Sequence, residues 1–381
     1  MFGKLDENLS NSDNYEKIID TLDRRGKIIG LDILKKPINT PANFLLKFAI
    51  VDVFLYHALI LYFTYLVYGD FLQSAFCWTT FGLGLDSIMK YYVFIFKRRD
   101  LHRIQDDMRT LFRRYEASDD EGSEKLRKIL RISSILNFLT FLCFLNTGFS
   151  LNSLTMTESF RTGEKTLIFG FHLPIIDHTT HLGYAINYAY QNLQMLLVIF
   201  HSSQGDGFYI VHMVLACARL EAIIHQIEVL DRYLISPDRD TLSDKEDKMI
   251  IDEYLKDILQ QHLDHIEYMN RMESLYSGYS FLLVCSCMMV VVINVFVLLS
   301  IFWLSGIFLS LAVFVKIMAF CVLGTVVTEH QKSLLFLLQS AQKPVEATMM
   351  KFKPLNLTTF LKCLNMIYSV CAMLFTMTRK K

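Results

Sequence analysis

The C-terminal segment of the chain carries a stripe of small and polar residues that could line a water-filled path. These residues recur at steps of three or four, which places them on one side of a helix. They are Thr358, Lys362, Asn365, Ser369, Ala372 and Thr376. The rest of the segment is mostly Leu, Met, Ile, Val, Cys and Phe. An apolar helix with one such face is typical of a membrane helix that turns this face toward water or protein.

Residue patterns that enzymes use are absent from the sequence. It contains no Gly-x-Gly-x-x-Gly after a strand, no P-loop, no His-Glu-x-x-His and no Gly-x-Ser-x-Gly. We therefore expect neither a catalytic site nor a cofactor.

The histidines and cysteines do not predict a metal centre. His262 and His265 are three residues apart, a spacing that can chelate a metal but that a solvated helix face explains better. A second group could bind zinc weakly or make its segment sensitive to pH. It consists of His172, Asp177, His178 and His181. All eight cysteines lie in apolar or helical stretches, so neither a disulfide framework nor a zinc site is expected.

The elements that must position these residues are predicted membrane-spanning helices. Of the 381 residues, 52% are hydrophobic, and the charged residues cluster between long apolar runs. The net charge of zero hides this segregation. Seven spans are predicted, and all six prolines lie outside them or at their edges. The spans cover residues 42–67, 71–96, 129–151, 182–203, 277–300, 303–327 and 355–378.

The distribution of Lys and Arg predicts the orientation of these spans. Basic residues are dense in the N-terminal tail, between spans 2 and 3, after span 4 and before span 7. The loop between spans 3 and 4 has only Arg161 and Lys165. The N-terminal tail has no apolar signal-peptide core. We expect a cytosolic N-terminus and, with an odd number of spans, a C-terminus outside, which is opposite to the topology of a G-protein-coupled receptor.

Two stretches outside the spans have an apolar face at helical spacing but are too polar to cross a membrane. They cover residues 210–234 and 245–274. Because no proline interrupts the second stretch, a single helix is predicted from about residue 245 to 300. The two helices could pack on each other, on a helix at 331–342 or on neighbouring subunits.

The chain is thus predicted to be an all-α membrane protein with a cytosolic layer. Its parts are a cytosolic N-terminal segment (1–41), spans 1–4 with an outside loop at 152–181 (42–203), cytosolic helices (204–276), spans 5 and 6 (277–327), a cytosolic helix and joint (328–354) and a last span (355–381).

Several segments of the sequence resemble the insect odorant receptor family. The closing signature of that family is similar to Gln342-Lys343-Pro344, the run from Pro354 to Lys362, and Tyr368-Ser369. Further similar segments are Arg98-Arg99-Asp100-Leu101, Phe171-His172-Leu173-Pro174 and the helix entry at 207–220. The resemblance covers nearly the whole chain and is most specific in the C-terminal third. One departure is the short stretch from Gly324 to Lys332, where the family usually has a longer link with a Tyr and a Trp.

The resemblance implies a ligand-gated, non-selective cation channel in the plasma membrane of olfactory sensory neuron dendrites. Such subunits form tetramers around a central pore with an obligate co-receptor; the seventh span lines the pore, and the cytosolic helices form an anchor domain where subunits meet. Because this chain lacks the long cytosolic insertion of the co-receptor, it resembles an odorant-tuning subunit. The expected partners are co-receptor subunits, a small volatile organic ligand, membrane lipid and permeant cations, and not nucleic acid.

The resemblance also implies an odorant pocket in the outer half of spans 2 to 6. A pocket for a volatile molecule is mostly apolar, with aromatic rings and a few polar groups. The candidate residues are Phe76, Thr80 and Leu83 in span 2, Phe141, Leu145 and Phe149 in span 3, and Tyr184, Tyr188, Gln191 and Met195 in span 4.

Under this resemblance the C-terminal stripe becomes a candidate pore wall. Met373 and Met377 are expected to help close the pore near its outer end, and Thr376 to turn toward water when it opens. Lys362 is unfavourable in a cation path and could snorkel to the inner mouth. The alternative is that the stripe packs against span 5 or 6, since small residues let helices approach closely.

Three other functions remain open from the sequence. A gustatory receptor is the same class of channel, but its usual Thr-Tyr-x-x-x-x-x-Gln-Phe near the C-terminus is absent here. A secondary transporter would have charged residues or broken helices at mid-membrane, which the spans do not clearly show. A metabotropic receptor is disfavoured by the predicted orientation.

Overall fold

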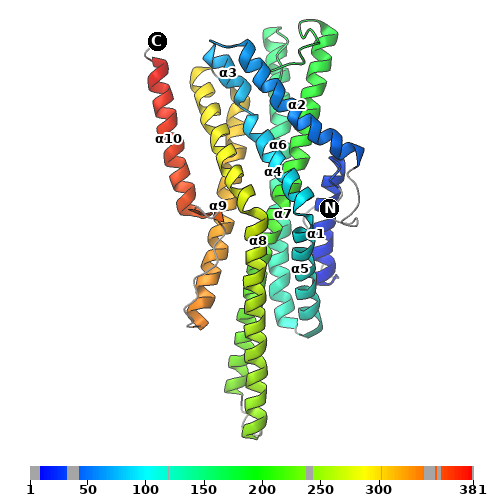
Figure 1. Cartoon of the computed structure of the whole chain (residues 1–381), viewed down its shortest axis with the longest axis vertical. Helices are drawn as coiled ribbons and strands as arrows, with labels where there is room; N and C mark the ends of the chain where they lie inside the picture. The colour runs from blue at the N-terminus through cyan, green and yellow to red at the C-terminus, as the bar shows by residue number, and fades with distance from the viewer. Residues whose placement is uncertain are drawn as a thin grey trace.

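The computed structural model of the chain is built almost entirely of helices (Figure 1). It describes residues 9–31, 43–118, 120–236, 243–301, 303–338, 348–349 and 353–379. The helices are α1 (Asn11–Ile28), α2 (Phe44–Leu66), α3 (Phe71–Trp78), α4 (Phe81–Phe96), α5 (Arg98–Ser118), α6 (Asp120–Thr162), α7 (His181–Ile235), α8 (Asp244–Ser300), α9 (Leu304–Leu338) and α10 (Leu357–Arg379). Two short antiparallel strands, β1 (Thr348–Met349) and β2 (Lys353–Pro354), precede α10.

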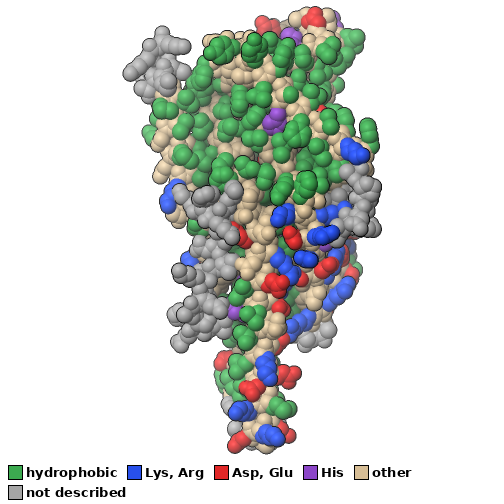
Figure 2. Space-filling model, in the orientation of Figure 1, with side chains coloured by type: hydrophobic (Ala, Val, Ile, Leu, Met, Phe, Trp, Pro, Cys, Tyr) green, Lys and Arg blue, Asp and Glu red, His purple; other side chains and the backbone are tan. Residues whose placement is uncertain are grey.

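The molecule is an elongated bundle with one apolar half and one polar end. The segment between α6 and α7, at one end of the bundle, lies at the top of Figure 1, and we call this the loop end. The face seen in Figure 2 is mostly hydrophobic from the loop end to about mid-height, and Lys, Arg, Asp and Glu gather below. We call the opposite end, where α8 begins, the polar end. Since α10 ends at the level of the loop end and α1 lies at about mid-height, the described chain ends lie at different levels of the bundle.

The longest helices run through both halves of the bundle. α6, α7 and α8 have 43, 55 and 57 residues, so each is roughly 65–85 Å long at 1.5 Å per residue. The hydrocarbon core of a bilayer is only about 30 Å thick. These helices must therefore continue well beyond the membrane. The predicted helix at 245–300 is confirmed by α8, which begins with a capping box between Ser243 and Glu246.

Among the residues that the structure describes, six helices are long and apolar enough to cross a membrane: α2, α6, α7, α8, α9 and α10. The predicted second span, 71–96, is not one continuous helix but is divided between α3 and α4. At the division the Thr79 hydroxyl donates to the Phe76 carbonyl, and Thr80 is buried as an acceptor for the Tyr56 hydroxyl. Local bonding by hydroxyl side chains competes with a regular helix, which explains the break.

The stretch at 210–234 was predicted to be helical, and the structure shows it as the continuation of the predicted fourth span in the single helix α7. Its apolar face at the polar end packs on neighbours as predicted: a cluster contains Leu220, Ile223 and Leu230 of α7, Ile258 of α8 and Leu334 of α9. Packing of the two amphipathic stretches on each other and on the helix before the joint is therefore confirmed within one chain.

Candidate functional site

The segment between α6 and α7 is fastened over the face of α7 that holds the predicted ligand residues. The Gln191 amide donates to the Phe171 carbonyl at 2.5 Å, and its oxygen accepts from the Phe169 amide at 3.0 Å. One turn earlier, the Asn187 oxygen accepts from the Leu173 amide at 2.6 Å. Gln191 and Asn187 are fully buried. Gln191 therefore positions this segment, which we call the strap (residues 166–173).

Beneath the strap, α6 and α7 share a cluster of aromatic, aliphatic and neutral polar side chains. Tyr188 donates to Asn152 at 2.9 Å, and the Asn152 amide lies 3.7 Å from the Met195 sulfur. Met195 is buried with Leu151, Ile168 and Ile199, and Phe141, Phe144, Phe169 and Tyr188 pack against them. A site of this kind suits a small, mostly apolar molecule with one or two hydrogen-bonding groups.

The candidate residues of span 2 lie on the other side of the strap. Thr80 bonds to Tyr56 of α2, the Phe76 ring lies 5.0 Å from the Trp303 ring, and Leu83 packs against the main core. The strap joins the two groups at Gly170, where an added Cβ would lie 2.7 Å from the Phe76 ring. Glycine is therefore required for the close approach of the strap to α3.

Two of the candidate residues of span 3 lie away from the others. Leu145 and Phe149 are 42% and 70% exposed on the outer surface of α6. Their spacing of four residues correctly defines a face, but the face that packs on α7 contains Gly148 and Leu151 instead. The face of α6 that packs on α7 is marked in the sequence by Gly148, a glycine inside a helix. A Cβ at this position would collide with Ile199 of α7.

Tyr184 lies nearer the loop end and closes one edge of the site. Its hydroxyl donates to the Thr166 carbonyl at 3.0 Å, and its ring centroid lies 5.7 Å from that of Tyr188. Next to the strap, His172 packs between Phe63 and His178. Burial lowers the pKa of His172 from its ordinary value, and the neighbouring His178 lowers it further, against a smaller opposite effect of Asp177.

The face of α10 that carries the stripe is open in the chain. The opposite face packs on the bundle through Phe360, Cys363 and Ile367, each 8% exposed. All five stripe residues with described side chains are exposed, as is Met373: they are Thr358, Lys362, Asn365, Ser369 and Ala372. Packing of the stripe against span 5 or 6 is therefore wrong. Thr376 and Met377 lie beyond the residues whose side chains the structure describes.

The open surface of α10 is wider than the stripe. Leu361, Met366 and Tyr368 are exposed as well. The exposed surface of α10 is therefore broad, and the stripe is its polar part.

The beginning of α10 is seated tightly on α9. The Leu357 amide donates to the Thr325 hydroxyl at 3.0 Å, and Asn356 caps the helix by accepting from the Thr359 amide at 3.0 Å. The Leu355 carbonyl occupies the space that a Cβ on Gly324 would need. α10 is thus held at its first turn, whereas its stripe is open.

A ring of four buried charges was missed by the sequence analysis. Lys90 lies 2.7 Å from Asp86 and 3.0 Å from Asp206, and Lys316 lies 2.7 Å and 2.9 Å from the same two carboxylates. The four side chains are between 0 and 5% exposed. The Tyr279 hydroxyl also donates to Asp206. The ring therefore ties α4, α7 and α9 together, with α8 joined through Tyr279.

The ring corrects two expectations about the spans. Asp86 and Lys90 lie inside the predicted span 71–96 and Lys316 inside the predicted span 303–327, although the spans were expected to show no clear charges at mid-membrane. The span 71–96, which was expected to be unbroken, is also divided into two helices. Buried charges persist where each is paired with an opposite charge. The pairing could not be seen from the sequence because Asp86 and Lys316 are 230 residues apart.

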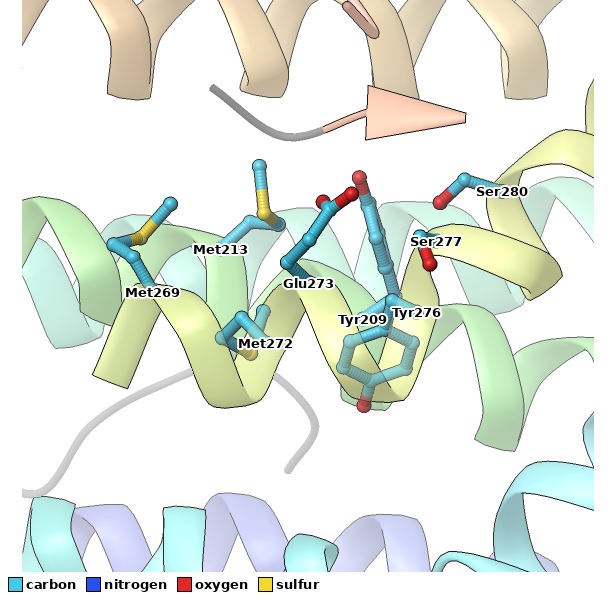
Figure 3. A pocket seen from close by; sticks show the side chains of 8 residues that line it. All are labelled: Tyr209, Met213, Met269, Met272, Glu273, Tyr276, Ser277 and Ser280. Carbon is cyan, nitrogen blue, oxygen red and sulfur yellow. The ribbon is translucent and has the colours of Figure 1, made fainter. Parts of the chain in front are cut away.

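Figure 3 shows a small cavity between α7 and α8. Tyr209 and Met213 line it from α7, and Met269, Met272 and Tyr276 are among its residues on α8. Its volume of about 10 Å³ is close to the minimum for one water molecule, and ligand pockets are usually 300–1,000 Å³. This cavity is therefore too small for an odorant-sized ligand.

Comparison with known proteins identifies the family and the fold of the chain. A family model described as "7tm Odorant receptor" matches residues 68–332, which is more than half of the chain. The matched range stops before the C-terminal signature. A search of curated proteins finds no significant match.

The fold is similar to that of the insect olfactory receptor OR5 from Machilis hrabei. The structure of OR5 in complex with eugenol has a TM-score of 0.77 and 15% identity, covering 97% of this chain and 100% of that chain. The OR5 structure without a named ligand has a TM-score of 0.71 and 16% identity, covering 96% and 99%. The family match over more than half of the chain shows that this chain belongs to the odorant receptor family, and its fold is that of an insect olfactory receptor.

Proposed function

We propose that the chain is the odorant-binding subunit of a ligand-gated, non-selective cation channel. The observation that carries this proposal is the open polar face of α10, whose opposite face packs on the bundle. Copies of α10 around a shared axis would enclose a path with polar walls. Lys362 lies one turn from the beginning of α10, where its side chain would reach the mouth of such a path.

The ligand we propose is a small volatile organic molecule bound between α6 and α7 under the strap. Support comes from the neutral, aromatic lining around Tyr188 and Met195 and from the hydrogen bond between Tyr188 and Asn152, whose groups suit a polar atom of a ligand. OR5 of Machilis hrabei, which shares the fold, is described in complex with eugenol, a small phenol. Eugenol is therefore a reasonable first ligand to test.

The proposed assembly is a tetramer with co-receptor subunits in the plasma membrane of olfactory neurons. In this arrangement the loop end faces outside, and the polar end, including residues 204–276 and the joint at 328–354, forms the cytosolic anchor domain. The Lys and Arg distribution supports this orientation. The residues at 355–381 would line the pore.

Current recording tests the proposal directly. Cells that express this chain with and without a co-receptor subunit are exposed to a panel of volatile compounds. We expect a ligand-evoked cation current only with the co-receptor; ligand transport without current would contradict the channel function. In the same cells Ser369→Cys should react with a water-soluble thiol reagent in the open channel. Ile367→Cys, on the packed face of α10, should not react.

A further inference from the structure

Two histidines at the edge of the strap lie ring against ring. The centroids of His172 and His178 are 4.0 Å apart, with 37° between the ring planes. His172 also rests on Phe63, at 4.4 Å. Both histidines are partly exposed. Their ring nitrogens make no hydrogen bond to any residue in the part of the chain that the structure describes.

We propose that His172 and His178 form a binding site for a divalent transition-metal ion such as Zn²⁺, and that the bound ion clamps the strap. Imidazole nitrogen is a common zinc ligand, at 2.0–2.1 Å. Two such nitrogens on one tetrahedral ion lie roughly 3.3 Å apart. The ring centroids are 4.0 Å apart, so rotation about the side-chain bonds must separate the stacked rings and turn one nitrogen of each toward the shared ion. Water molecules complete the coordination.

The position of the site makes the clamp relevant to ligand access. His172 belongs to the strap between Phe171 and Leu173, whose backbones are bonded to α7. His178 belongs to the turn before α7, where one oxygen of Asp177 accepts from the amide and the hydroxyl of Thr179. A metal ion would therefore join the strap to this turn, in addition to the bonds to α7. The strap packs on the proposed ligand site through Ile168 and Phe169. The effect on ligand entry therefore rests on the proposed function, whereas metal binding itself does not.

A second cluster of residues with metal-binding side chains is not proposed as a metal site, because its carboxylates are already paired with cations. Glu121, His225 and Glu228 bring their ligand atoms within 4.8 Å of one another. However, Lys125 lies 3.8 Å from Glu121 and bonds to Glu228, and Arg232 lies 2.8 Å from Glu121. Protein cations already neutralise these carboxylates, so this cluster is a salt-bridge network.

Calorimetric titration of the purified full-length protein with Zn²⁺ tests the site without any odorant. The variants are His172→Gln and His178→Gln, with His181→Gln as control, because His181 is exposed at the first turn of α7 and does not stack on the pair. Even loss of a group that only orients a metal ligand costs about tenfold or more in affinity. We therefore expect at least about a tenfold loss in each of the first two variants and none in the control. Unchanged affinity in His172→Gln and His178→Gln would overturn the proposal.

Circular dichroism and thermal melting check that each variant is folded. If His172→Gln, which also loses the contact with Phe63, does not fold, the more peripheral His178→Gln decides. Copper spectroscopy supplies an independent reading of the ligands: the wild type should show two nitrogen ligands to Cu²⁺, and each single variant one. Two nitrogens in His178→Gln would exclude the pair as the site.

Current recordings then test the clamp. Zn²⁺ should slow the rise of the odorant-evoked current in the wild type and in His181→Gln, a chelator should reverse this effect, and His178→Gln should lack it. Zinc binding without any change in current kinetics would refute the clamp. If no variant gives an odorant current but zinc binds as expected, the proposed channel function fails while the metal site stands.

Discussion

Replacing Lys316 by methionine should strongly destabilise the protein, because it leaves a buried negative charge without compensation. In the wild type two lysines neutralise two carboxylates. In Lys316→Met, Asp86 and Asp206 share Lys90 alone. Breaking a buried ion pair by removing one partner costs about 3–5 kcal/mol. The fold offers no water to solvate the remaining charge, since both carboxylates are at most 2% exposed.

A second variant separates the effect of charge from the effect of lost contacts. Asp86→Asn combined with Lys316→Met retains the Lys90–Asp206 pair at 3.0 Å and restores neutrality. Neutral replacement of buried ion pairs is often tolerated. The double variant should therefore be more stable than Lys316→Met alone, with a coupling of about 1–3 kcal/mol.

Thermal unfolding in detergent ranks the stability of the wild type, the double variant and Lys316→Met. A change of 1 kcal/mol shifts the melting temperature by roughly 2–4 °C, so Lys316→Met should melt on the order of 10 °C below the wild type. Lys332→Met is a matched control on the same helix, because its pair with Glu329 is 54% and 61% exposed and should be worth less than about 1 kcal/mol. A double variant less stable than Lys316→Met would refute the idea that the four charges compensate one another.

Three further predictions concern the ligand site and α10. Tyr188→Phe should shift the half-maximal odorant concentration by roughly fivefold, which corresponds to about 1 kcal/mol for one neutral hydrogen bond, and Tyr188→Ala should shift it further without removing surface assembly; unchanged dose–response curves would count against the site. Gln191→Leu should release the strap and make it more sensitive to limited proteolysis, whereas Asn192→Leu, which loses only a bond within α7, should not. Gly324→Ala should displace the beginning of α10 and change the current without ligand, whereas Gly278→Ala, whose nearest neighbour would be 3.8 Å away, should behave like the wild type.

The long helices could be predicted because their signals are local. α8 runs from Asp244 to Ser300, and its capping box and lack of proline are visible in the sequence. The break between α3 and α4 was missed because two consecutive threonines in an apolar stretch do not by themselves end a helix. Their effect depends on Tyr56 of α2, which is bonded to Thr80 only in the folded chain.

Only the part of the candidate site that depends on local spacing along a helix could be predicted from the sequence. Periodicity correctly grouped Tyr188, Gln191 and Met195 on one face of α7, but it could not show that Gln191 holds the strap. Periodicity also assigned Phe149 to the site, although the neighbours of α6 place it on the outside. Side chains that find their partners across large sequence separations, such as Asp86 and Lys316, need the fold before they can be interpreted.

The position of the charge ring on α7 has a mechanical consequence. Asp206 lies near the middle of this unbroken helix of 55 residues, so roughly 40 Å of helix extends on each side. If a rigid helix pivots about a fixed midpoint, its two ends move in opposite directions. A rotation of about 5° there would move the two tips by about 3.5 Å in opposite directions. If ligand binding at the loop end tilted α7, the polar end of α7 would therefore be displaced by a similar distance in the opposite direction, among the helices packed there.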